Sequence, residues 1–350
     1  MATIRVYLLT YRRPHLLRRA LASLLAQSFT DWICELHNDA PGDDAPRLVL
    51  AELAPADPRI SYQPHPVGWG LNRVFNHCLR AVDEPYATIL EDDNWWEPAL
   101  LESLLRGLAA NPDVGLAWAN LRIWQEQADG SWTDTGATIW PMRQGSVRFE
   151  FPVLLQAFDS LHSNGAMLFR TALGPAAIVP ASTPSVFMES ARERALPAPF
   201  LLLREPLGHF ALTLSTGRSQ DRRQWVEVKL LEAASFLAAM PLADGAWDDL
   251  WARCRAAQPA RTSLLLLVGL AGVRRREIFA RATWRDWLRL ARSLLGSPRA
   301  NLLGLRFRKT YPELWVYLAE KTAARAAQAR ERGWSGIEAG SLFERRDQGP

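Results

Sequence analysis

The first 125 residues alternate between short apolar runs and longer segments in which apolar residues recur at helical spacing. Strands are expected over residues 4–9, 32–36, 60–62 and 87–90. Helices are expected over residues 16–25, 71–82 and 100–108. Strands that alternate with helices are typical of βαβ units, so this part of the chain predicts an α/β fold with a mostly parallel sheet.

The pattern changes twice further along the chain. Beyond residue 114 it becomes mixed, and a turn at Asp129 and Gly130 predicts a hairpin. Two further strands are expected over residues 200–203 and 209–212. Strand signals disappear beyond Trp225, where Ala, Leu, Arg and Trp dominate and helical spacing continues to about residue 327. We therefore predict a boundary near residue 225, with a mostly helical domain behind it.

Polar turns follow three of the predicted strands, over residues 10–14, 38–44 and 91–94. In open α/β sheets, ligands bind beyond the carboxyl ends of the strands. Three consecutive carboxylates, Glu91, Asp92 and Asp93, repel one another, and such a cluster is typical of a site where a cation compensates the charge. The alternative is an acidic loop before the helix that starts near Pro98. The position at a strand end favours a divalent metal ion.

Several motifs occur in order over about 100 residues. They read Thr-Tyr-Arg-Arg-Pro over 10–14, Leu-x-Ser-Leu-x-x-Gln over 21–27, Asn-Asp-Ala-Pro-Gly-Asp over 38–43 and Leu-Glu-Asp-Asp-Asn-Trp-Trp-Glu-Pro over 90–98. Gly68, Gly70 and Asn76 give a looser match between the last two. In these segments the chain resembles the family 2 inverting glycosyltransferases of the GT-A fold, in which the last motif is the DxD metal motif.

The resemblance implies a GT-A (Rossmann-like) α/β fold, a mixed sheet flanked by helices, followed by a mostly helical C-terminal domain. The GT-A domain would span residues 1–224, with a donor half of about 1–115 and an acceptor half of about 116–224. Residues 225–350 would form the basic helical domain, and we expect its last dozen residues to be frayed.

The resemblance also implies roles for three carboxylates. Asp93 would bind Mn²⁺ or Mg²⁺, and Asp92 would meet the ribose or the waters of the metal. Such an ion neutralises the charge that grows on the diphosphate leaving group of a nucleotide sugar. Asp39 would accept a hydrogen bond from the base, which favours a UDP- or dTDP-linked donor.

Four further residues would complete the nucleotide-sugar site. The resemblance implies that Thr10 and Tyr11 line the base and that Arg12 or Arg73 contacts the diphosphate. For both arginines a solvated or structural charge is an equal alternative. Asn38 departs from the family pattern, in which an Asp stands at this position, and this leaves the identity of the base open.

Inverting transfer needs a general base that takes the proton of the acceptor hydroxyl, which contributes about 10²- to 10⁴-fold to the rate. In the family this carboxylate lies in the acceptor half, before a helix and a strand, and Glu189 is our choice over Glu193. A salt bridge within the helix, without a catalytic part, is the competing interpretation of Glu189. Asp159 and His162 are weaker alternatives. The segment 164–167 is expected beside the acceptor pocket on the resemblance alone.

We therefore predict a glycosyltransferase that moves a sugar from a nucleoside diphosphate to an acceptor hydroxyl with inversion, in glycan or surface polysaccharide biosynthesis. A glycan, a lipid-linked compound or a small molecule would be the acceptor. A catalytically inactive binding or scaffold protein is the alternative, and a nucleotidyltransferase is less favoured because the turn over 10–14 has no glycine. No GxGxxG motif follows the first strand, which argues against a dinucleotide-binding oxidoreductase. Gln220, Arg223 and Trp225 are similar to the QxxRW motif of processive synthases, but their spacing is one residue too long.

Charge is distributed unevenly along the 350 residues, whose formal net charge is only +4. Residues 1–110 hold 10 Lys and Arg against 14 Asp and Glu, whereas residues 251–350 hold 20 against 8. The basic C-terminal helices could be the solvated face of a bundle, a surface that contacts anionic lipid, or a groove for a partner. No nucleic-acid motif accompanies the charge, so we expect no nucleic-acid partner.

Two further observations bear on the compartment. No run of 18 or more apolar residues exists, so no transmembrane anchor is expected. The three cysteines are far apart and lack CxxC spacing, which is typical of a reducing environment. We predict a cytoplasmic protein that is either free or peripheral to the inner face of the membrane.

Overall fold

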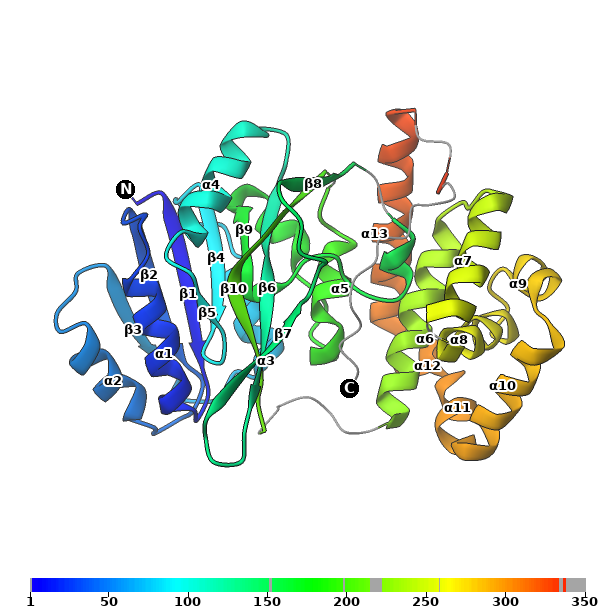
Figure 1. Cartoon of the computed structure of the whole chain (residues 1–350), viewed down its shortest axis with the longest axis horizontal. Helices are drawn as coiled ribbons and strands as arrows, with labels where there is room; N and C mark the ends of the chain where they lie inside the picture. The colour runs from blue at the N-terminus through cyan, green and yellow to red at the C-terminus, as the bar shows by residue number, and fades with distance from the viewer. Residues whose placement is uncertain are drawn as a thin grey trace.

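The computed structural model describes residues 2–150, 153–197, 199–214, 222–257, 259–333 and 336–337. Figure 1 shows a central sheet with helices on both faces, and beside it a helical region formed by the second half of the chain. The fold is α/β with a mixed sheet, followed by a mostly helical C-terminal region, as the sequence predicts. The last dozen residues, which we expect to be frayed, lie outside the described residues.

One mixed sheet organises the first 212 residues. Its strands are β1 Ile4–Thr10, β2 Trp32–Asn38, β3 Ile60–Pro64, β4 Tyr86–Glu91, β5 Trp95–Trp96, β6 Leu116–Glu126, β7 Trp132–Thr138, β8 Ser146–Phe149, β9 Met167–Arg170 and β10 Phe200–Leu212. The order is β3-β2-β1-β4-β9-β6-β10-β5, with β7 on β6 and β8 on β10. Strands β3, β2, β1 and β4 are parallel, whereas β9 runs antiparallel between β4 and β6.

The strand register brings all three polar turns to one edge of the sheet. Thr10 at the end of β1 pairs with Asn38 at the end of β2, and Leu9 pairs with Glu91 at the end of β4. The residues that follow these strands therefore meet at one carboxyl edge. The polar turns that the sequence places after three separate strands belong to one site.

Helices cover the sheet because their apolar faces are packed on it. They are α1 Pro14–Leu25, α2 Ala45–Leu53, α3 Leu71–Cys78, α4 Leu100–Ala110 and α5 Met188–Glu193. Helix α1 starts with Pro14, whose missing N–H costs nothing in a first helical turn. Its residues Leu17, Leu21 and Leu24 are fully buried in the same core as β1 and β4, so this helix holds the ends of both strands in place.

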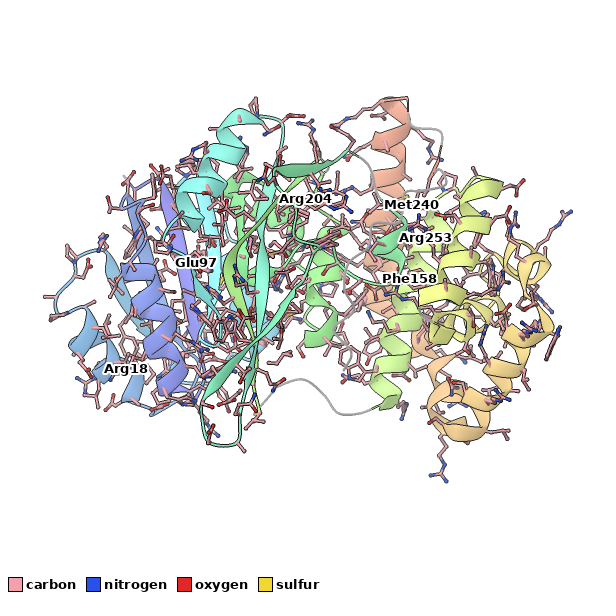
Figure 2. The ribbon with its side chains drawn as sticks, in the orientation of Figure 1. Arg18, Glu97, Phe158, Arg204, Met240 and Arg253 are labelled. Atoms are coloured by element: carbon pink, nitrogen blue, oxygen red, sulfur yellow. The ribbon has the colours of Figure 1, made fainter. Side chains whose placement is uncertain are left out.

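The C-terminal region consists of α6 Arg222–Ala239, α7 Asp244–Ala257, α8 Pro259–Leu270, α9 Arg275–Arg281, α10 Trp284–Gly296, α11 Pro298–Gly304, α12 Phe307–Thr310 and α13 Pro312–Glu331. Its apolar core also includes Leu154, Phe158 and Phe187 from the preceding part of the chain. Phe158 lies where the two parts meet (Figure 2). The helical region is therefore packed onto the acceptor half through a shared core.

The structure extends several predicted elements and merges two of them. The two strands expected over 200–203 and 209–212 are one strand, β10, with register shifts around Pro206 against β6. Proline cannot donate to the ladder, which accounts for an interruption there. Helix α3 ends at Cys78, earlier than the predicted residue 82, and Arg80 instead bonds the Glu35 carboxylate of β2. The hairpin at Asp129 and Gly130 is confirmed, since β6 and β7 pair across it.

Candidate active site at the carboxyl edge of the sheet

Asp92 is the most buried carboxylate of the acidic loop after β4, with 1% of its surface exposed. Its Oδ2 accepts hydrogen bonds from Thr10 Oγ1 at 2.7 Å and from the Tyr11 backbone N–H at 3.2 Å. Burial raises the pKa of Asp92 to about 6, although the Arg13 charge opposes this shift. Thr10 and Asp92, which the sequence assigns to one site, are therefore in direct contact.

Arg13 is the cation of this loop. Its guanidinium lies 2.5 Å from Asp92 Oδ1 and 2.8 Å from Asp93 Oδ2. A second arginine, Arg19 of α1, donates to the Asp93 carbonyl at 3.0 Å and lies 3.5 Å above the Trp95 ring. Neither arginine is among the residues singled out from the sequence, although Arg13 belongs to the quoted motif. Arg12, which is among those residues, and Arg13 are adjacent in the turn, and the sequence pattern alone does not distinguish their roles.

Tyr11 and Arg12 lie at the outer side of the same turn. Both are exposed, and the Arg12 guanidinium lies 5.0 Å from the centre of the Tyr11 ring. Arg12 has φ of 57°, in the left-handed region that side chains other than glycine rarely adopt. Such backbone strain is often found at functional sites. Arg73, on α3, is also exposed, and it lies over the Trp69 ring at 4.8 Å.

Asp39 follows β2 and anchors the glycine-containing loop. Its Oδ1 accepts hydrogen bonds from His65 Nδ1 at 2.8 Å and from the Trp69 backbone N–H at 2.6 Å, and its Oδ2 accepts one from the Gly70 N–H at 2.9 Å. Because Oδ2 accepts only this one bond among the described residues, it retains capacity for a base N–H. His65 also stacks on Trp69, with ring centres 3.9 Å apart.

Asn38, which departs from the family pattern, shapes the loop that carries Asp39. Its side-chain Nδ2 donates to the Asp43 carbonyl at 2.7 Å, and its Oδ1 accepts from the Ala40 N–H at 3.0 Å. An ionised Asp at this position could accept but could not donate. The Asn38 side chain therefore both donates and accepts a hydrogen bond within this loop, which an ionised Asp could not do.

The segment that contains Asn164 and Gly165 lies between Glu189 and the acidic loop and contacts both. Its Oε1 accepts a hydrogen bond from the Asn164 N–H at 2.8 Å. The next residue, Gly165, packs so closely on Asn94 that a Cβ there would lie 2.8 Å from Asn94 Nδ2. The buried Arg192 guanidinium interacts electrostatically with both Glu189 and Glu91. The structure thus brings Glu189 to the side of the acidic loop.

The alternatives to Glu189 have structural partners. Glu193 is buried and accepts hydrogen bonds from the Leu161 N–H at 2.8 Å and from His162 Nδ1 at 2.7 Å. These bonds lower the pKa of Glu193 although burial opposes the shift. His162 is buried in the same contact, and Asp159 interacts with the Lys229 charge of α6. Glu193 and His162 therefore connect helix α5 to the segment before β9.

A second polar cluster lies under the Asp39 loop. Glu35, His37 and His77 place ligand atoms within 4.8 Å of one another. The Glu35 carboxylate already pairs with Arg5 and with Arg80, whose Nη2 lies 2.6 Å from Oε1. These two guanidinium groups supply the positive charge that a metal ion would otherwise bring. Asp92 and Asp93 also have an arginine partner, Arg13, so charge does not separate the two clusters. The aspartates differ in offering oxygen ligands only, which Mg²⁺ and Mn²⁺ prefer.

Comparison with solved structures identifies the fold. The crystal structure of S. aureus TarS residues 1–349 in complex with UDP covers 99% of this chain and 98% of its own length, with a TM-score of 0.56 and 12% identity. The structure of the same TarS fragment in complex with UDP-GlcNAc covers 99% of both chains, with a TM-score of 0.53 and 11% identity. The chain thus shares the GT-A fold of this TarS fragment over almost its whole length.

Sequence comparison matches part of the chain to a known family model. Residues 6–164 match the family model described as glycosyl transferase family 2. An Escherichia coli (strain K12) protein named as a colanic acid biosynthesis glycosyl transferase, WcaA, is 29% identical over 102 residues, which are 29% of this chain. The uncharacterized protein MT1568 of Mycobacterium tuberculosis is 28% identical over 122 residues, or 35% of this chain. In each case the match spans 36% of the relative's length. The match to this family model covers less than half of the chain.

Within the described residues, no helix is both long enough and apolar enough to cross a membrane. Of the QxxRW-like residues, Arg223 and Trp225 lie in α6, and Gln220 lies outside the described residues.

Proposed function

We propose that this chain transfers a sugar from a nucleoside diphosphate sugar to an acceptor hydroxyl with inversion, in polysaccharide biosynthesis. The observation that carries the proposal is the convergence of Asp39, Asp92 and Asp93 at one edge of a family 2 domain. The relative named for colanic acid biosynthesis supports the setting. The TarS structures with UDP and UDP-GlcNAc support a UDP-linked donor, and a dTDP-linked donor fits the same base contact.

Donor binding would use the two loops that meet at this edge. Asp39 Oδ2 would accept the imide N–H of the base, while Thr10 and Tyr11 lie beside it on the neighbouring strand end. Asp93 and Asp92 would hold a Mn²⁺ or Mg²⁺ ion, which when bound offsets the charge on the diphosphate leaving group. Arg12 and Arg73, both exposed, would be free to approach the phosphates.

Glu189 would be the general base. It would take the proton of the acceptor hydroxyl as the acceptor oxygen forms its bond to the anomeric carbon and the bond to the diphosphate breaks. The Asn164 N–H donates a hydrogen bond that orients its carboxylate. The contact of Gly165 with Asn94 couples this group to the acidic loop.

A turnover screen tests the proposal. The full chain is incubated with a set of nucleotide sugars, Mn²⁺ or Mg²⁺, and candidate glycan or lipid-linked acceptors, and released nucleoside diphosphate and pyrophosphate are both measured. Metal-dependent release of a nucleoside diphosphate, with a product of inverted anomeric configuration, supports the proposal. Pyrophosphate release would instead indicate a nucleotidyltransferase. Absence of both turnover and nucleotide binding would indicate a binding or scaffold protein.

The location of the protein relative to the membrane is independent of the proposed transfer chemistry. We predict from the sequence a cytoplasmic protein that acts at, or is free of, the inner face of the membrane. All three cysteines are free and buried, in agreement with the reducing compartment that this prediction assumes.

A further inference from the structure

Helix α10 buries one face and leaves a second apolar face in contact with solvent. Asp286 and Leu290 are buried on the inner face, where the helix packs on α8. Four large apolar side chains, which we call the outer stripe, remain exposed: Trp284 at 69%, Trp287 at 39%, Leu288 at 41% and Leu295 at 83%. A surface helix of a globular protein normally has one apolar stripe, directed at the core. The outer stripe therefore requires a separate explanation.

The helical geometry places the outer stripe on one continuous face. At about 100° per residue, Trp284, Trp287, Leu288 and Leu295 fall within an arc of about 100°. Asp286 and Leu290 fall on the opposite side of the helix, in agreement with their burial. Figure 1 shows α9 and α10 at the edge of the helical region that lies farthest from the sheet.

Arginines without acidic partners border this stripe. Arg285 and Arg292 are exposed, and among the described residues no carboxylate lies within ion-pair distance of either. Both fall at one margin of the outer stripe, about 80–100° from Trp284 around the helix. The Arg285 guanidinium lies 5.4 Å from the centre of the Trp284 ring, so the aromatic and basic groups are adjacent.

The acidic groups of α9 and α10 are already neutralised. Asp286 pairs with Arg255 at 2.9 Å and with Arg289 at 3.0 Å. Glu277 lies 3.7 Å from the Arg274 guanidinium. In the described part of these two helices, the surface charge beside the outer stripe is therefore uniformly positive.

We propose that the outer stripe of α10 docks on an anionic lipid bilayer, with the helix axis in the plane of the surface. Leu288 and Leu295 would enter the boundary between headgroups and acyl chains, and Trp284 and Trp287 would lie at headgroup level, where indole rings are enriched. Arg285 and Arg292 would contact lipid phosphates. This surface is distinct from the carboxyl edge of the sheet, and the proposal does not depend on the transferase activity.

A bilayer fits this surface better than a second copy of the chain. A twofold interface would bring the outer stripes of two chains together, and with them the unpaired Arg285 and Arg292 of each. Like charges facing one another in an interface are unfavourable. An anionic lipid surface supplies the complementary negative charge. Its headgroup and acyl-chain boundary can also bury the apolar face of one helix that lies in the plane of the surface.

Co-sedimentation of the full chain with lipid vesicles tests the proposal. One set of vesicles contains phosphatidylcholine alone. The other contains phosphatidylcholine with roughly 40% phosphatidylglycerol, because an anionic lipid surface attracts basic residues. We expect at least tenfold tighter binding to the anionic vesicles, and weaker binding as the salt concentration rises.

Variants assign the binding to the stripe. Leu295→Ser combined with Trp284→Ser should weaken binding to anionic vesicles by tenfold or more, whereas Val316→Ser, an exposed apolar position on α13, should not. Arg285→Glu with Arg292→Glu should weaken it similarly, and Arg106→Glu on α4 serves as the charge control. Thermal melting by circular dichroism confirms that each variant is folded.

Three results would overturn the proposal. The first is wild-type binding that is absent or equal on the two kinds of vesicle. The second is stripe variants that bind as the wild type does. The third is a wild-type dimer that the stripe variants convert to monomers without any change in vesicle binding, which would assign the face to a second copy. Nucleotide-sugar turnover without vesicles is measured in parallel, so failure of this proposal is separable from failure of the proposed function.

Discussion

The Arg13 guanidinium bridges the two aspartates of the acidic loop, 2.5 Å from Asp92 Oδ1 and 2.8 Å from Asp93 Oδ2. Burial of the guanidinium opposes its charge, but Asp93 and Asp92 more than compensate and raise the pKa of Arg13. The positive charge thus stands where a divalent ion would meet the same carboxylates. A metal ion held by Asp92 and Asp93, as proposed, would therefore have to compete with Arg13.

Replacement of Arg13 should therefore strengthen metal binding. In Arg13→Gln the two carboxylates lose their resident counter-charge, and we expect Mn²⁺ to bind about tenfold more tightly, which corresponds to ~1.4 kcal/mol. Calorimetric titration of Mn²⁺ without nucleotide measures this directly. Arg18→Gln is the matched control, because Arg18 lies on helix α1, which follows Arg13 directly, and pairs with the exposed Glu52 instead. Weaker Mn²⁺ binding in Arg13→Gln would show that Arg13 supports the metal site.

Glu193 should contribute to stability in a pH-dependent way. Its folded-state pKa is lowered by the His162 and Gln156 contacts despite burial, so its contribution is present above the unfolded-state pKa and is lost as the pH falls through the folded value. Glu193→Gln should lower the free energy of unfolding at pH 7 by about 3 kcal/mol, the typical cost of breaking a buried charged pair.

Urea denaturation of wild type and Glu193→Gln at a series of pH values checks this prediction. The difference between the two proteins should shrink below about pH 4, where glutamate begins to take up a proton in the unfolded chain. Glu102→Gln, at an exposed helical position, is the control and should change stability little. A difference that stays constant down to low pH would contradict a role for the ionised carboxylate.

Gly165 should be required for the contact between the acceptor segment and the acidic loop. A Cβ at this position would lie 2.8 Å from Asn94 Nδ2, and the Asn94 side chain is held by its bond to the Ala211 N–H. Gly165→Ala should destabilise the fold by about 1–3 kcal/mol and lower kcat. Gly296→Ala, where no atom lies within 4 Å of the added Cβ, is the control for stability and turnover. Equal melting temperatures for the two variants would contradict this account.

Glu189→Gln should separate chemistry from binding. The amide keeps the size of the side chain and its acceptor contact with the Asn164 N–H, but it cannot take a proton. We expect kcat to fall by a factor of about 10² or more while the donor Kd stays within about twofold. Steady-state kinetics and calorimetry of donor binding measure the two effects. Transfer at near wild-type rate would assign the base elsewhere.

The strand framework was predictable because each strand of the donor half is a short apolar run that ends in a polar turn. The convergence of Thr10, Asn38 and Glu91 then follows from parallel pairing. The antiparallel strand β9 was not predicted, since its four residues carry too little pattern. Short strands of this kind are defined by the neighbours they pair with.

The finer contacts of the site depend on backbone conformations that the sequence does not encode locally. The left-handed conformation of Arg12 places its side chain by Tyr11, while Arg13 reaches the aspartates. For this reason the sequence pattern points to Arg12 and not to Arg13. His65 is a single histidine in a loop, and only its contact with Asp39 gives it a role.

Metal-dependent nucleotide binding is the most direct test of whether the carboxyl edge of the sheet holds a nucleotide sugar. Titration of UDP or dTDP into the full chain by calorimetry should show binding with Mn²⁺ present and at least tenfold weaker binding after chelation. Asp93→Ala should remove the dependence on Mn²⁺, whereas Asp129→Ala, in the hairpin turn, should bind as the wild type does. If neither nucleotide binds in the presence of Mn²⁺, or if Asp93→Ala retains the full metal dependence, the assignment of this edge of the sheet as the nucleotide-sugar site is wrong.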